Sequence, residues 1–82
     1  MTDKSTSLAD QAYEKIKENI LNLTWPPGMP LTEARLTDEL GMSRSPIRSA
    51  IHRLQVEGLI TTDYYRSMTV SEITDKDIHE IY

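Results

Sequence analysis

The first quarter of the chain carries one apolar stripe at helical spacing. Its members recur three and four residues apart: Ala9, Ala12, Tyr13, Ile16, Ile20 and Leu23. Ser7 and Asp10 have the spacing of a capping box, which predicts that the helix begins at Ser7. The run from Trp25 to Gly28 contains two prolines, so we expect the helix to end there. We expect Trp25 to fill the core over the helix ends rather than to stack on a ligand.

A second, shorter helical pattern follows these prolines. Thr32 is its expected N-cap, and Leu31 and Leu36 have the spacing of a hydrophobic staple. Leu36 and Leu40 lie four residues apart and predict the inward face of this helix. Gly41 is placed as the residue that ends it.

A third helix is predicted after a tight turn over residues 41–44. Ser45 is its expected N-cap and Pro46 its first helical residue, where a proline loses no hydrogen bond. Gly58 is expected to end it, which gives a helix over residues 45–57. Four apolar residues at helical spacing predict its buried face: Ile47, Ala50, Ile51 and Leu54.

The hydrophobic period changes from helical to alternating after this helix. Residues 59–64 are β-branched and aromatic, and residues 68–73 alternate between apolar and polar, which predicts a β-hairpin with its turn at residues 65–67. The turn contains no glycine, so its type stays open. Two helices joined by a glycine-containing turn and followed by a hairpin predict a winged helix-turn-helix. The fold class is therefore mainly α with a small β-hairpin, a three-helix bundle plus a wing.

The composition excludes several classes of protein. With 82 residues, of which 38% are apolar and 27% charged, the chain forms one small domain. It has no cysteine, which rules out cysteine-based zinc fingers and cysteine nucleophiles. The sequence contains no nucleophile–base pair, phosphate-binding loop or metal cluster, so we expect no enzyme, no catalytic residue, no cofactor and no metal. We expect no signal peptide and no membrane partner, because no apolar run approaches the roughly 20 residues of a membrane span.

The charges are unevenly distributed along the chain. Thirteen acidic and nine basic residues give a net charge of −4, which excludes a uniformly basic nucleic-acid binder. Four of the five arginines nevertheless lie within residues 35–54, and every lysine lies outside that window. A charge cluster is often only a solvated face, but arginine offers a planar set of donors that suits phosphates and guanine edges. Within this window we expect Arg53 to pair with Glu57 one turn later.

The outward face of the third helix carries the candidate binding residues. No acidic residue lies between Gly41 and Leu54, although a merely solvated helix usually includes Glu or Asp. Amides at a helix N-terminus attract phosphates, and small hydroxyls allow a helix to approach DNA closely. We therefore predict that this helix enters the major groove of double-stranded DNA. The expected contacts are Ser43, Arg44, Ser45, Arg48, Ser49 and His52.

Two arginines outside this helix have two interpretations each. Arg35 either lies over the DNA backbone or pairs with Asp38 or Glu39 on its own helix, and the spacing favours neither. Arg66 at the hairpin tip is a candidate DNA contact, although a single arginine at a tip is as often only solvated.

Three segments carry a family resemblance. Residues 27–36, PGMPLTEARL, look like the stretch P-G-x-x-L-x-E-x-x-L, and residues 40–51, LGMSRSPIRSAI, look like L-G-V-S-R-T-P-V-R-E-A-L. Residues 54–60, LQVEGLI, are similar to L-x-x-E-G-L-V. Together they resemble the N-terminal DNA-binding domain of GntR-family bacterial transcriptional regulators, over residues 9–73.

The resemblance implies a cytoplasmic bacterial repressor or activator whose homodimer binds a near-palindromic operator. It implies that the DNA contacts include Arg35, Arg44, Ser45 and Arg48, with the wing tip near Arg66. Leu23 and Ser49 depart from the family pattern, which usually has Gly and Glu at these positions, and the wing lacks a usual glycine near Ser67.

The resemblance also divides the chain. Residues 7–73 are the winged helix-turn-helix domain, and residues 74–82 are similar to the join into the all-helical effector domain of the FadR-like (FCD) branch. We expect residues 74–82 to be a linker or the start of a missing C-terminal domain that binds a small-molecule effector. In this segment Thr74 is the expected cap of a helix with His79 on its surface.

A second class of function fits the same fold. A winged helix also serves as a protein-binding module without DNA binding, and the acidic tail and the outward-facing Val56 support that alternative. It does not explain why arginines gather at one helix N-terminus. A steep loss of binding with salt would identify DNA as the partner.

Overall fold

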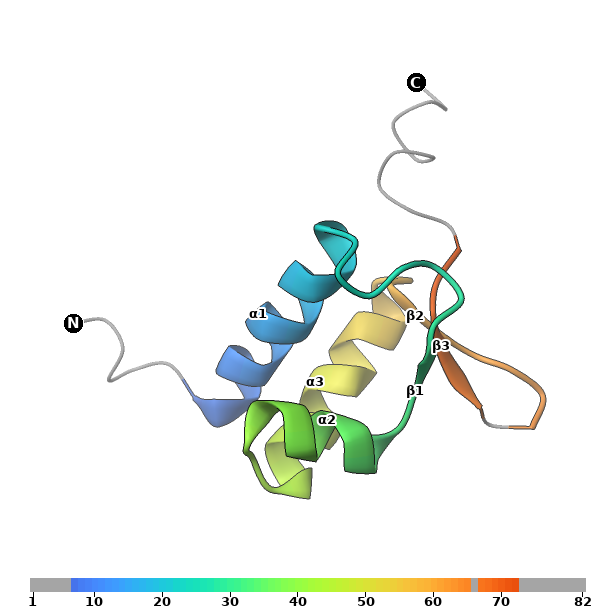
Figure 1. The fold of residues 1–82 in the computed structure, drawn as a ribbon. Helices are drawn as coiled ribbons and strands as arrows, with labels where there is room; N and C mark the ends of the chain where they lie inside the picture. Colours follow the sequence, from blue (N-terminus) through green and yellow to red (C-terminus); the bar gives the residue numbers. More distant parts are fainter. Residues whose placement is uncertain (1–6, 66, 73–82) are drawn as a thin grey trace.

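The computed structural model describes residues 7–65 and 67–72, which form three helices and a small sheet. The helices pack on one another, and the sheet lies beside them with its hairpin extending away from the bundle (Figure 1). This is a winged helix-turn-helix, and the predicted fold class is confirmed. The elements in chain order are α1 (Leu8–Leu21), β1 (Pro30–Leu31), α2 (Glu33–Leu40), α3 (Arg44–Val56), β2 (Ile60–Thr62) and β3 (Met68–Val70).

Helix α1 begins as predicted and ends earlier than predicted. The Ser7 hydroxyl accepts a hydrogen bond of 3.0 Å from the backbone N–H of Asp10, which confirms the cap. The helix ends at Leu21 because Leu23 takes a left-handed conformation, with φ of 66°. Leu23 is 62% exposed, so placing it on the apolar stripe was wrong. Trp25 is buried in the core, as expected.

Helix α2 has the two ends that the sequence predicts. The Thr32 hydroxyl accepts a hydrogen bond of 3.0 Å from the Arg35 N–H. At the other end Gly41 takes a left-handed conformation, with φ of 66°, and donates its N–H to the Thr37 carbonyl at 2.8 Å. A left-handed residue at this position is the usual way to end a helix and satisfy its last carbonyls.

Helix α3 starts earlier than the sequence suggests. Its N-cap is Ser43 and its first helical residue is Arg44, so the prediction of Ser45 as the cap and Arg44 as a turn residue was wrong. Pro46 is then the third helical residue. A proline is tolerated there because the first N–H groups of a helix have no intrahelical partner. The shift places Arg44, expected in the preceding loop, and Ser45, expected at the cap, in the first helical turn.

The hairpin is confirmed, and a third strand joins it. Strands β2 and β3 pair antiparallel, with Thr61 opposite Thr69, and the sheet order is β1-β3-β2. Strand β1 was not predicted, because two residues are too few to show an alternating pattern. The second strand of the hairpin, predicted over residues 68–73, ends at Val70. Ile73 and the helix expected in residues 74–82 with His79 lie outside the described residues.

The core lies where the three helices meet and is closed by the sheet. The predicted inner face of α3 is fully buried, since Ile47, Ala50 and Leu54 have no exposed surface and Ile51 is 5% exposed. The other buried apolar residues are Ala12, Tyr13, Ile16, Ile20, Trp25, Leu31, Leu36, Ile60 and Val70. The side of α3 that faces the core is therefore known, and the side chains on its opposite side face solvent.

Candidate nucleic-acid interface

The outward face of α3 is the candidate binding surface. Ser45, Ser49 and His52 are exposed on it, and so is Val56 near its C-terminal end. Arg48 is also exposed, at 62% of its side-chain surface. The structure thus brings Ser45, Ser49 and His52 to one side of α3, with Arg48 beside them, because the opposite side of the same helix packs in the core.

The N-terminus of α3 is an open helix end. Ser43 precedes it in an extended conformation, and its hydroxyl makes no capping hydrogen bond. Arg44 and Ser45 follow, and both are exposed. No acidic residue occupies the first turn of this helix. A helix end of this kind favours an anion through its amides and its dipole.

The arginines near this face have different surroundings. Nε of Arg48 donates to a carboxylate oxygen of Glu33, the first residue of α2, at 2.9 Å. Within residues 7–65 and 67–72, Arg35 and Arg44 have no ion pair. The pairing of Arg35 with an acid on its own helix is therefore not observed, and its contact with DNA stays a prediction.

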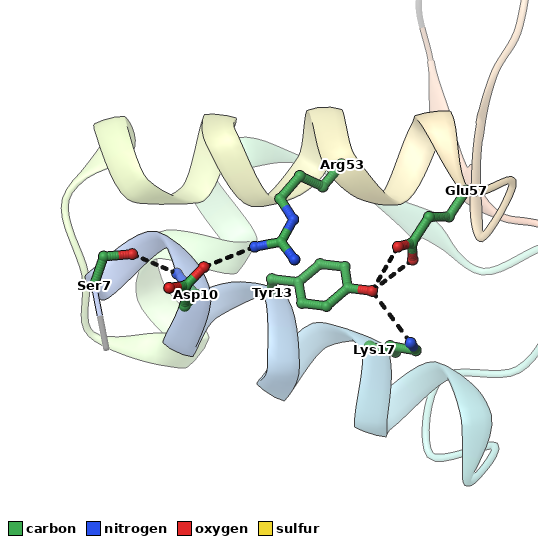
Figure 2. A network of polar contacts seen from close by, with 6 residues as sticks. All are labelled: Ser7, Asp10, Tyr13, Lys17, Arg53 and Glu57. Atoms are coloured by element: carbon green, nitrogen blue, oxygen red, sulfur yellow. Dashed lines mark hydrogen bonds and ion pairs between the residues drawn. The ribbon is translucent and has the colours of Figure 1, made fainter. Parts of the chain in front are cut away.

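Arg53 lies apart from the candidate surface. It was expected to pair with Glu57, but its Nη1 donates to a carboxylate oxygen of Asp10 at 2.8 Å, so that prediction was wrong. Its guanidinium carbon also lies 3.8 Å from the centre of the Tyr13 ring, a cation–π contact with α1. Arg53 pairs with α1 and not with Glu57 because α1 provides both a carboxylate, on Asp10, and an aromatic ring, on Tyr13 (Figure 2).

Glu57 belongs to the same link between α1 and α3. The Tyr13 hydroxyl lies 2.6 and 2.7 Å from the two carboxylate oxygens of Glu57, to which it donates its proton. Lys17 donates to that hydroxyl at 3.1 Å, and this contact raises the pKa of Lys17. Figure 2 shows these contacts joining the two helices. These contacts hold α3 against α1. They involve Tyr13, Lys17 and Glu57, none of which belongs to the candidate binding surface.

Asp10 anchors the other end of this link. Hydrogen bonding with Ser7 and, after it, with Arg53 holds the pKa of the Asp10 carboxyl below its usual value. The carboxylate therefore stays ionised opposite the Arg53 guanidinium at neutral pH. Arg53 is held on the α1 side of α3, and it is not counted among the candidate binding residues.

The wing is built around one carboxylate. Asp63 Oδ1 accepts hydrogen bonds from the N–H groups of Tyr65 and Ser67, at 2.8 and 2.9 Å. This carboxylate links residues on either side of the hairpin tip, in a connection that contains no glycine. Tyr64 and Tyr65 are exposed there and meet edge to face. Arg66 lies outside the described residues, so its role stays a prediction.

Sequence reasoning did not find the partner of Arg48. Glu33 precedes it by 15 residues on another helix, and no local periodicity connects the two.

Among the described residues no three His, Asp or Glu side chains gather as a metal site requires. None of the described helices has the length and apolar character needed to cross a membrane.

Comparisons with known proteins agree with this fold. A family model described as "Bacterial regulatory proteins, gntR family" matches residues 8–70. An uncharacterized HTH-type transcriptional regulator, YdhC of Bacillus subtilis (strain 168), is 39% identical over 80 residues, which cover 98% of this chain and 36% of that protein.

Solved structures show the same likeness. The Escherichia coli protein McbR/YncC superimposes with a TM-score of 0.75 and 29% identity, covering 92% of this chain and 35% of that one. Lar, which controls expression of the Listeria monocytogenes agr system, gives a TM-score of 0.76 and 31% identity, covering 89% of this chain and 34% of that one. The chain thus spans about a third of the length of these proteins.

Proposed function

The chain belongs to the GntR family of bacterial regulatory proteins, with a winged helix-turn-helix DNA-binding domain at residues 8–70, and on that premise we propose how the domain binds DNA. Helix α3 enters the major groove of a near-palindromic operator and reads its sequence. One observation carries this proposal: the outward face of α3 starts at an open helix end and bears no acid. Its residues are Ser43, Arg44, Ser45, Arg48, Ser49 and His52.

The chemistry of these side chains supports sequence reading. Arginine can donate two parallel hydrogen bonds to the edge of a guanine in the major groove. Small serines beside it let the helix backbone come close to the bases and phosphates. Arg35, on α2, has no ion pair among the described residues. It is suited to the DNA backbone, because the first helix of the motif crosses that backbone.

The rest of the proposal concerns the whole regulator. We propose that it acts as a cytoplasmic homodimer, with a small-molecule effector bound by a further domain, as in the FadR-like branch. The length of the relatives supports only the further domain, because they are about three times as long as the chain. A dimer would place two copies of α3 on the two halves of a palindrome.

The protein-binding alternative is not favoured. It relied on the acidic tail and on the exposed Val56, and Val56 lies at the opposite end of α3 from Arg44. Relatives such as YdhC of Bacillus subtilis and the regulator from Agrobacterium vitis are described as transcriptional regulators.

Two substitutions test the proposed contacts. The probe is double-stranded DNA that the 82-residue chain enriches from a pool with a random central segment. Arg44→Ala and Arg48→Ala should each weaken binding to it while the domain stays folded. A variant that loses a guanine contact should lose about 1–3 kcal/mol and its preference at one base pair. A variant that loses a phosphate contact should weaken on all sequences alike.

Lys15→Ala is the matched control, because Lys15 is an exposed cation on α1. It removes the same charge away from the candidate surface and should change binding much less. If both arginine variants bind like the wild type while their circular dichroism is unchanged, the proposed role of α3 is wrong.

A further inference from the structure

Glu33 is the only acid among the described residues that pairs with an arginine of the candidate surface. Its carboxylate oxygen lies 2.9 Å from Nε of Arg48, and its side chain is 34% exposed. Arg35 and Arg44 have no such partner within the described part of the chain. A carboxylate beside a DNA-binding surface repels phosphates. The position of Glu33 beside this surface therefore needs an explanation.

The pair leaves the reading edge of Arg48 available. A guanidinium has five N–H donors, and the contact with Glu33 uses only the one on Nε. The four N–H groups on Nη1 and Nη2 remain, and two parallel N–H groups are what a guanine edge accepts. A side chain already held by Glu33 also loses less rotamer freedom when it binds.

The charge of Glu33 affects whether Arg48 binds a phosphate or a base edge. A neighbouring carboxylate offsets the positive charge of Arg48 and repels phosphate oxygens, whereas a base edge carries no net charge. Resting on the proposed function, we infer that Glu33 is a positioning residue that directs Arg48 to a base edge and away from the backbone. Glu33 thereby raises discrimination between DNA sequences and lowers attraction to DNA in general.

A merely structural role for Glu33 makes a different prediction. Glu33 is the first residue of α2, where an acid stabilises the helix dipole. Loss of that effect would lower the melting temperature and leave the ratio of affinities for two DNA sequences unchanged. The ratio of affinities for two DNA sequences therefore distinguishes a positioning role of Glu33 from a structural one.

Glu33→Gln in the 82-residue chain tests the inference. The probes are the duplex enriched by the wild type and the same duplex altered at the base pair whose preference Arg48→Ala relaxes. We expect the ratio of the two Kd values to fall about two- to tenfold, the scale of immobilising one long side chain. If Arg48, which no longer faces a carboxylate, turns to a phosphate, the plot of log K against log salt should steepen by about 0.9.

Glu39→Gln is the matched control. Glu39 is an exposed acid on the same helix, and within the described residues it has no ion pair, so this variant removes one charge without touching Arg48. We expect it to keep the wild-type ratio. In an Arg48→Ala background, Glu33→Gln should reduce the ratio no further.

The outcomes separate this inference from the function it rests on. A wild-type ratio in Glu33→Gln, or an equal loss in Glu39→Gln, would overturn the positioning role while the loss of discrimination in Arg48→Ala still supports the proposed function. If the wild type itself does not discriminate between sequences, the proposed function fails, and this inference fails with it.

Discussion

Leu23 has a backbone conformation that a side chain disfavours. Its φ of 66° is the only positive value at a non-glycine residue in the described ranges, and its side chain is 62% exposed. A left-handed conformation costs a residue with a Cβ atom about 1–2 kcal/mol. The structure therefore gives a physical reason for the glycine that the family pattern has at this position.

Leu23→Gly should stabilise the domain. Relief of the strain outweighs the greater freedom of glycine in the unfolded chain, and we expect a net gain of about 0.5–1 kcal/mol. Thermal unfolding followed by circular dichroism should show a melting temperature higher by about 2–8 °C. Leu21→Gly is the control, because Leu21 is an exposed leucine in the last turn of α1; there glycine should lower stability. A Leu23→Gly variant that melts below the wild type would contradict the strain at Leu23.

At the level of elements, features set by neighbouring residues could be predicted from the sequence. The caps at Ser7 and Thr32 depend on hydrogen bonds across three residues, and both are formed. The left-handed Gly41 and the buried face of α3 follow from the same local rules. The spacing of apolar residues in α3 was therefore enough to predict which of its side chains face solvent.

Features set by contacts between elements could not be predicted. Arg53 pairs with Asp10, 43 residues away, because packing of α1 on α3 outweighs an i+4 neighbour. Glu33 reaches Arg48 only when α2 and α3 are folded together. Strand β1 forms because β3 is available beside it, and its own two residues carry no pattern. The candidate surface on α3 could therefore be predicted from the sequence, whereas the contact of Glu33 with Arg48 could not.

The two faces of α3 predict opposite responses to the same truncation. Ile51→Ala empties a buried position and should cost about 2–5 kcal/mol, which approaches the roughly 3–5 kcal/mol that a domain of this size holds. Val56→Ala trims a side chain that is 75% exposed and should change stability by no more than about 0.5 kcal/mol. Urea unfolding of both variants measures the difference. Equal stabilities would mean that the assigned phase of α3 is wrong.

At the scale of the whole molecule, the net charge opposes the proposed partner. The chain carries −4 and has an isoelectric point near 5.0, so its overall field repels DNA. In the proposed function, attraction to DNA comes from the few cations at the start of α3 and on α2, against this overall field. A single domain with so few contacts should bind one half-site weakly, and joining two domains should strengthen binding through effective concentration.

Fusion of the chain to an unrelated dimeric coiled coil tests this expectation. The fusion should bind a palindromic site more tightly than the chain alone, and its salt dependence should steepen by about 0.9 for each added phosphate contact. Fluorescence anisotropy over a range of salt concentrations measures both quantities. If the fusion binds no more tightly, and sedimentation shows that the chain alone is already a dimer, then dimerisation lies within these 82 residues.

The most direct test of the central claim is a map of the DNA-binding surface by NMR. Backbone amide shifts of the labelled chain are followed while the enriched duplex is added. We predict that the largest changes fall on residues 43–52 and on Arg35, with little change at Glu14 and Glu18, which are exposed on α1. Largest changes on α1, with the first turns of α3 unchanged, would contradict the claim that α3 reads DNA.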